Sequence, residues 1–261
     1  MVFDTRGRRK HVVRVVYAIL ALLMGASLFL VVGPFSIGKL LGGGESTTSG
    51  AKILNEQAER TEAKLRKDPT NEALLLSLAR TRIAASKSAT EVNQETGATA
   101  FTAEGHEELS RAAEAWTRYL KLTKEPNPST ALLMSGTYFS LAETSASLEE
   151  ASANVKKAAA TQRIAAEAQP TVNSLTTLAI YEYYAGDFAA GDKATKEAKA
   201  LVPAKAEAKE VQKQMAEFRQ RGKAFQKQKQ EVVKQEGSQR KEALENPLGG
   251  LSGSTGSSLG E

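Results

Sequence analysis

Residues 183–203 read "YYAGDFAAGDKATKEAKALVP", and this stretch is the strongest indication of the fold expected for the chain. Gly-Asp-Phe at 186–188 stands between two alanine-rich stretches with helical spacing, and Pro203 ends the second of them. Glycine and aspartate favour a turn, whereas the flanking alanines favour helix. The stretch therefore predicts the turn and second helix of a helical hairpin, either alone or as one unit of a repeat.

Similar first helices occur earlier in the chain. Three segments each follow a proline within a few residues: "NEALLLSLARTRIAAS", "STALLMSGTYFSLAE" and "TVNSLTTLAIYEYYAG". Each contains three spaced positions of which the last is small, so that another helix can approach its backbone. The matched sets are Leu75, Leu78 and Ala79; Leu132, Ser135 and Gly136; and Leu175, Leu178 and Ala179.

A second helix is expected after each of these segments. Its spaced positions are Ala112, Trp116 and Tyr119; Ala158, Gln162 and Ala165; and Gly191, Thr195 and Ala198, closed by Pro126, Pro170 and Pro203. The step from 158 to 191 is 33 residues, as is the step from 170 to 203. This period is close to the roughly 34 residues of one class of helical repeat. The pattern predicts about three stacked hairpins within 51–203.

The third unit resembles the tetratricopeptide repeat family. The positions that match are Leu175, Leu178, Ala179, Gly186, Asp187, Phe188, Gly191, Ala198 and Pro203, and the resemblance spans roughly 70–203. It implies that Gly186 supplies the turn, that Phe188 packs between the helices, and that Gly191 and Ala198 allow a close crossing.

The resemblance also implies a concave groove that binds a protein or peptide, lined by residues of the first helices. Mapped by position, the expected partner-binding residues are Arg80, Ile83, Thr130, Thr137, Asn173, Thr176 and Tyr183. Most of the aromatic side chains, Trp116 and Tyr119 among them, are instead expected to pack within and between the hairpins.

The N-terminal region has the pattern of a membrane anchor. Residues 15–32 contain no charged residue and would span about 27 Å as a helix, close to the roughly 30 Å of a hydrocarbon core. We predict a transmembrane helix at 15–35. Arg6, Arg8, Arg9, Lys10 and Arg14 precede it, so the segment 1–14 is expected in the cytoplasm and the bulk of the chain outside it.

A cleaved signal peptide is the alternative for this segment, because signal peptides and membrane anchors both have basic residues before an apolar run. The run is longer than usual for a signal peptide, and no Ala-x-Ala pattern follows it. An uncleaved, single-pass anchor in the cell membrane is therefore favoured. A buried core helix is a weaker alternative, given the basic flank.

Three further segments differ in composition. Residues 36–50 are rich in glycine, serine and threonine and are expected to form a flexible linker, and 246–261 a disordered tail. Residues 204–245 predict one long charged helix with a narrow apolar stripe at Val211, Met215, Phe218, Phe225 and Val232. Its first half is expected to cap the last hairpin.

Composition favours an all-α protein. Apolar residues make up 41% of the 261 residues but aromatic ones only 6%, and alanine, valine and leucine supply most of the remainder. The chain has no cysteine, which excludes disulfides and thiolate chemistry. A formal net charge of +5 is modest, so nucleic-acid binding by the whole molecule is not expected.

Motifs for catalysis or cofactors are weak. "HEELSR" at 106–111 has Ser110 where a zinc-protease helix needs its second histidine, so His106 is expected to be an ordinary residue near a helix start. "GSSLG" at 256–260 matches a hydrolase motif only inside the serine–glycine tail. "GGGESTTSGAK" has Ala51 where a phosphate loop needs lysine. We expect no enzyme activity, no metal and no cofactor.

The sequence thus predicts a membrane-anchored helical scaffold that binds protein or peptide partners. Bacterial envelope assembly factors and cytochrome c maturation scaffolds share this layout, and the latter is one alternative. A second alternative is an anchored oligomer assembled through the helix at 204–245. Contact of that basic helix with anionic lipid or nucleic acid is a third.

Overall fold

The computed structural model describes residues 47–92 and 99–245, and these are mostly helical, as predicted. The elements are α2 (Thr47–Lys67), α3 (Glu72–Ser88), β1 (Thr90–Val92), β2 (Thr99–Phe101), α4 (Ala103–Leu120), α5 (Pro128–Glu143), α6 (Leu148–Ala168), α7 (Val172–Ala185), α8 (Phe188–Ala200) and α9 (Lys205–Glu245).

The N-terminal predictions fall mainly outside the described residues. Of the predicted linker 36–50, residues 47–50 belong to α2, which therefore begins earlier than the pattern indicated. The anchor at 15–35, the basic segment before it and the tail at 246–261 are not described. Within 47–92 and 99–245, no helix combines the length and apolar character needed to cross a membrane.

The polar segment between α3 and α4 forms a short antiparallel ribbon of β1 and β2. Thr90 pairs with Phe101 and Val92 with Thr99. Its side chains are largely exposed, so the ribbon adds little to the core. The threonines, Val92 and Phe101 of these strands suit extended backbone, a local preference that the helical interpretation of the chain passed over.

Side-chain caps set where the helices begin. Asn71, Thr102, Asn127, Ser147, Thr171 and Asp187 each accept a hydrogen bond from the backbone N–H three residues later. Such a cap is worth about 1 kcal/mol because it satisfies an otherwise unpaired donor. At the opposite end of α7, Gly186 adopts φ 92°, a left-handed conformation that only glycine adopts without strain.

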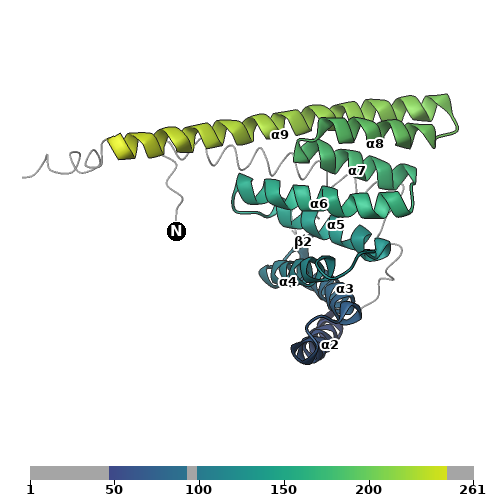
Figure 1. The fold of residues 1–261 in the computed structure, drawn as a ribbon, viewed down its shortest axis with the longest axis vertical. Helices are drawn as coiled ribbons and strands as arrows, with labels where there is room; N and C mark the ends of the chain where they lie inside the picture. Colours follow the sequence, from purple (N-terminus) through teal and green to yellow (C-terminus); the bar gives the residue numbers. More distant parts are fainter. Residues whose placement is uncertain (1–46, 93–98, 246–261) are drawn as a thin grey trace, which may run out of the picture.

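Successive helices pack against one another in chain order (Figure 1). The closest partners are α3 with α4, α5 with α6 and α7 with α8, and α2 packs on α3. The long helix expected over 204–245 is α9, which lies against α7 and α8. Figure 1 shows its C-terminal part running out past the other helices.

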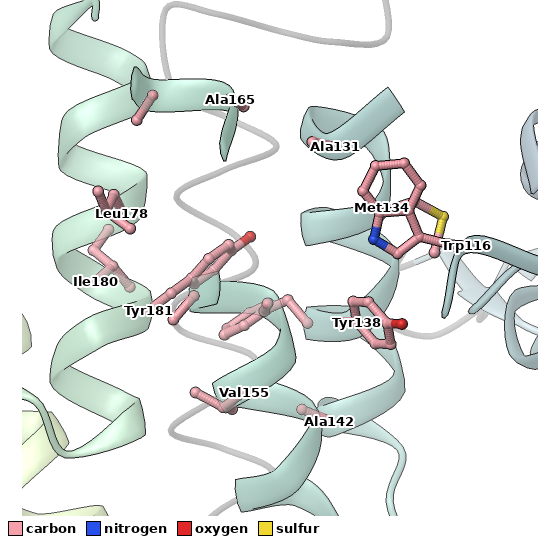
Figure 2. Close-up of a cluster of buried hydrophobic side chains, with 14 of the residues drawn as sticks. Trp116, Ala131, Met134, Tyr138, Ala142, Val155, Ala165, Leu178, Ile180 and Tyr181 are labelled. Carbon is pink, nitrogen blue, oxygen red and sulfur yellow. The ribbon is translucent and has the colours of Figure 1, made fainter. Parts of the chain in front are cut away.

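The core between the helices combines alanine with a few large rings. Figure 2 shows Trp116, Met134 and Tyr138 on one side of this cluster and Leu178 and Tyr181 of α7 on the other. The rings of Phe139 and Tyr181 stack with centroids 4.8 Å apart, which joins α5 to α7. Small residues let the helices approach, and the rings fill the space that remains.

One buried charge network ties α2, α3 and α4 together. Arg82 of α3 is only 2% exposed, and it donates to Glu108 of α4 at 2.8 and 2.9 Å and to Glu62 of α2 at 2.7 Å. Because a buried guanidinium without partners would cost several kcal/mol, these carboxylates and Arg82 depend on one another. The network therefore favours one register among α2, α3 and α4.

The first helices of the three hairpins share one burial phase. Counted from the cap residues Asn71, Asn127 and Thr171, the positions four, seven and eight residues later are all buried. They are Leu75, Leu78 and Ala79; Ala131, Met134 and Ser135; and Leu175, Leu178 and Ala179. The second of the sets predicted from sequence is therefore wrong by one residue. Leu132 is 50% exposed, since the cap at Asn127 turns it outward.

The predicted second-helix positions are all buried. They are Ala112, Trp116 and Tyr119; Ala158, Gln162 and Ala165; and Gly191, Thr195 and Ala198. A Cβ placed on Gly191 would overlap the ring of Tyr183, so glycine is required for the crossing of α7 and α8. Phe188 packs against the same ring, with centroids 6.3 Å apart.

Candidate partner-binding face

The seven residues predicted to bind a partner fall into two groups. Four are buried, with at most 5% exposure: Ile83, Thr130, Thr137 and Tyr183. The other three keep accessible surface: Arg80, Asn173 and Thr176. These four side chains pack against neighbouring helices in the described structure, and a partner-binding role for the seven residues stays a prediction.

Arg80 and Thr130 are brought together at the junction of α3 and α5. The Nε of Arg80 donates to Thr130 Oγ1 at 2.8 Å, and its Nη2 donates to Asn127 Oδ1 at 3.0 Å. Asn127 Oδ1 also accepts from the backbone N–H of Thr130, so the arginine completes the cap of α5. The exposed guanidinium is thereby held in place at the start of α5.

Tyr183 is the centre of a contact among α7, α8 and α9. Its hydroxyl donates to Asp192 Oδ1 at 3.0 Å and lies 2.9 Å from Thr195 Oγ1. Burial raises the pKa of Tyr183 to about 12. Hydrogen bonds from Arg219 of α9 lower the pKa of Asp192 below its usual range, and the same guanidinium lies over the ring of Phe188. These contacts hold α9 on the last hairpin.

Asn173 and Thr176 lie in the first turns of α7. Asn173 is exposed, and Thr176 is half-buried. Thr176 Oγ1 donates to the backbone oxygen of Val172 in its own helix, so its hydroxyl is already engaged. Asn173 is thus the more exposed residue of this pair.

The most open apolar surface on a first helix is on α5, and the sequence reasoning missed it. Leu132 is 50% exposed and Leu133 40% exposed, although both belong to a helix whose other large side chains are mostly buried. Gly136 follows one turn later, and a Cβ built there meets no atom within 4 Å. The cap residue Asn127 could have revealed this surface. Counted from Asn127, the positions of Leu132, Leu133 and Gly136 differ from those that are buried in all three first helices.

One half-buried acid, Glu143, carries a strongly shifted pKa. Burial raises the pKa of Glu143, at the end of α5, to about 7. None of the described residues hydrogen-bonds Glu143 Oε1 or the hydroxyl of Tyr184, and both atoms are buried. Burial also raises the pKa of Tyr184 to about 12. The carboxyl is thus held in its neutral form more strongly than an exposed glutamate.

His106 lies near the start of α4, as predicted. Its ring meets the edge of Phe101 and approaches Thr144 Oγ1 at 3.3 Å, and burial lowers its pKa. Across the residues that the structure describes, no group of three or more His, Cys, Asp or Glu is placed to hold a metal ion. Comparison of the chain with protein-family models and with curated proteins found no match.

Proposed function

We propose that this protein is a non-enzymatic scaffold that binds a protein or peptide through the open face of α5, here defined as Leu132, Leu133 and Gly136. The observation that carries the proposal is the exposure of two adjacent leucines beside a glycine that no described contact requires. Exposed apolar residues that cluster in this way typically mark interaction sites. A glycine beside them lets a partner backbone come close.

Neighbouring residues add polar contacts to this face. Arg80 is fixed at the start of α5 and offers a guanidinium that a carboxylate or a backbone oxygen of the partner would accept. The leucine pair then supplies the apolar anchor. The expected partner segment therefore combines apolar side chains with an acceptor or an acid near one end.

The scaffold is proposed to be of the tetratricopeptide repeat type. Support comes from the shared burial phase of α3, α5 and α7 relative to their caps, and from the small residues at the crossings of the second helices. The spacing between caps is uneven, because the insertions after α3 and α5 lengthen the first two units. The extra residues after α3 lie in the segment that contains β1 and β2, whereas those after α5 mostly lengthen α6 at its N-terminal end, because only 144–147 separate α5 from α6.

We further propose that residues 15–35 anchor the scaffold in the cell membrane with the helices on the non-cytoplasmic side. The support is the uncharged run at 15–32 and the basic residues before it. Tethering would keep the binding face close to partners that reside in or near the membrane.

In-cell photocrosslinking tests the binding face. A photoreactive residue is placed at Leu132 and, as a matched control, at Leu201, which is 46% exposed but lies after α8. We expect a discrete crosslinked product, identifiable by mass spectrometry, from position 132 and none from 201. Equal products at both positions would show that exposure alone drives the reaction, and the proposal would fail.

A substitution pair completes this test. Leu132→Ser is expected to abolish the crosslink formed from position 133, whereas Leu201→Ser is expected to leave it unchanged. Both positions are exposed, so each substitution changes stability by no more than about 0.5 kcal/mol. Loss of binding in Leu132→Ser with an unchanged melting temperature would assign the effect to the face.

An anchored oligomer is the second candidate, because α9 extends past the other helices (Figure 1). Light scattering compares the full chain with a chain that ends after residue 226, which keeps Phe225 in the core. A drop in mass to that of a monomer supports assembly through the outer part of α9, and an unchanged mass removes this candidate.

A further inference from the structure

The basic residues of α9 whose side chains are described divide into two sets by direction. Arg219 binds Asp192, Arg221 lies over the ring of Phe218 at 5.3 Å, and Lys229 donates to Ser152 of α6 at 2.8 Å. These three side chains therefore contact the protein. The other lysines with described side chains lie on the opposite side of the helix.

We define the lysine stripe as the lysines on the outer face of α9. Its members are Lys205, Lys209, Lys213, Lys223, Lys227 and Lys234. At 3.6 residues per turn they fall within an arc of roughly 80°, and at 1.5 Å per residue they span about 44 Å. Glu231 is the one acid in this arc. The buried residues Met215, Phe218 and Phe225 lie on the other side.

The stripe has few contacts within the molecule. All six lysines are exposed, and the first five form neither a hydrogen bond nor an ion pair with any described residue. The exposed residues between them are small or neutral, namely Ala216, Gln220 and Ala224. A row of exposed cations, the first five of which form no hydrogen bond or ion pair, favours attraction to a surface of opposite charge over burial in a protein groove.

We infer that the lysine stripe lies flat on a membrane surface that contains anionic lipid. Three features favour a lipid plane over nucleic acid. A straight row of about 44 Å can touch a plane along its whole length, whereas a duplex curves away from it within a groove about 12 Å wide. The stripe contains no arginine to form bidentate base contacts and no aromatic ring to stack on bases.

Binding in this way would fix the orientation of the stack. The opposite side of α9 packs on α7 and α8, so those helices would stand away from the lipid with α9 parallel to the surface. The inference does not depend on the partner-binding face of α5 or on the anchor at 15–35, because the stripe would bind an anionic surface with or without them.

Fluorescence energy transfer to labelled lipid headgroups tests the stripe in the full chain. The chain has no cysteine, so one cysteine at Ala216 places a donor fluorophore within the stripe, and one at Ala63 of α2 is the control. The protein is mixed with vesicles of neutral lipid or of neutral lipid containing phosphatidylglycerol. We expect greater transfer from position 216 in the anionic vesicles, reversed by high salt, and no difference from position 63.

The charge variant replaces five lysines of the stripe with glutamine: K205Q, K209Q, K213Q, K223Q and K227Q. The expected result is that the difference between the two vesicle types disappears. In single-lysine variants of the same series, affinity for anionic vesicles should fall roughly fivefold per lysine. The side chains replaced have no intramolecular bonds, so circular dichroism and melting temperature should stay unchanged.

Two outcomes would overturn the inference. One is equal transfer from position 216 in neutral and anionic vesicles, or a difference that survives in the glutamine variant. The other appears when a DNA duplex is added to the anionic vesicles: displacement of the protein onto the duplex at equal charge concentration would assign the stripe to nucleic acid. Failure of either kind leaves the α5 crosslinking result unaffected, so the two proposals are judged separately.

Discussion

Gly136 and Gly191 both lie inside helices, but their immediate surroundings are opposite. Gly136 lies inside α5 with open space where a Cβ would be, whereas a Cβ on Gly191 would overlap Tyr183. We expect Gly136→Ala to stabilise the protein by about 0.5–1 kcal/mol, because alanine loses less backbone entropy in a helix. Gly191→Ala should destabilise it by about 1–3 kcal/mol. Urea unfolding measures both, and equal effects would contradict the assigned contacts.

Glu143 makes stability depend on pH. Burial raises its pKa from an ordinary 4.5 to about 7, so the folded state holds the proton more tightly than the unfolded state. Stability is therefore lost as pH rises from about 4.5 through about 7, by up to about 3 kcal/mol. Glu143→Gln should be more stable than wild type at pH 8 and equal to it at pH 4.5. Urea unfolding at both pH values tests this, and a difference independent of pH would refute it.

At the scale of elements, the docking of α9 depends on Gly222. A Cβ there would lie 2.5 Å from the backbone oxygen of Tyr183, and a backbone atom cannot rotate aside as a side chain can. Gly222→Ala should therefore shift α9 and lower stability by about 1–3 kcal/mol. Lys223→Ala is the control, because Lys223 follows Gly222 directly but its exposed side chain makes no hydrogen bond. Unfolding of the two variants side by side gives the comparison, and equal stability would mean that α9 does not sit so close.

The hairpins could be predicted because helical spacing and prolines are local signals. The register of α5 was misjudged by one residue, since Leu132 and Leu133 are both large and only the cap at Asn127 distinguishes outward from inward positions. The candidate site was predicted less well. Tyr183 lies on a first helix, but whether it is open depends on α9, which follows it by some twenty residues and covers it through Gly222. Such coverage is not encoded in any local pattern.

For the whole molecule, packing between neighbours predicts a graded response to truncation. Among the described helices, α9 packs mainly on α7 and α8. Removal of residues 205–261 should increase amide hydrogen exchange in α7 and α8 by about tenfold or more, with much smaller changes in α3 and α4. Removal of 246–261 alone serves as the control and should change none of these. Uniform acceleration along the chain would indicate one cooperative unit instead.

The chain-order packing of the helices also determines how the molecule would respond to mechanical force. Because the helices pack mainly on those before and after them in the chain, tension applied to the two ends would detach them one at a time from the end that yields first. The Arg82 network, towards one end, and the Tyr183 contact, towards the other, would each resist this detachment. A force–extension trace would then show several small steps, with the highest forces where these two contacts break.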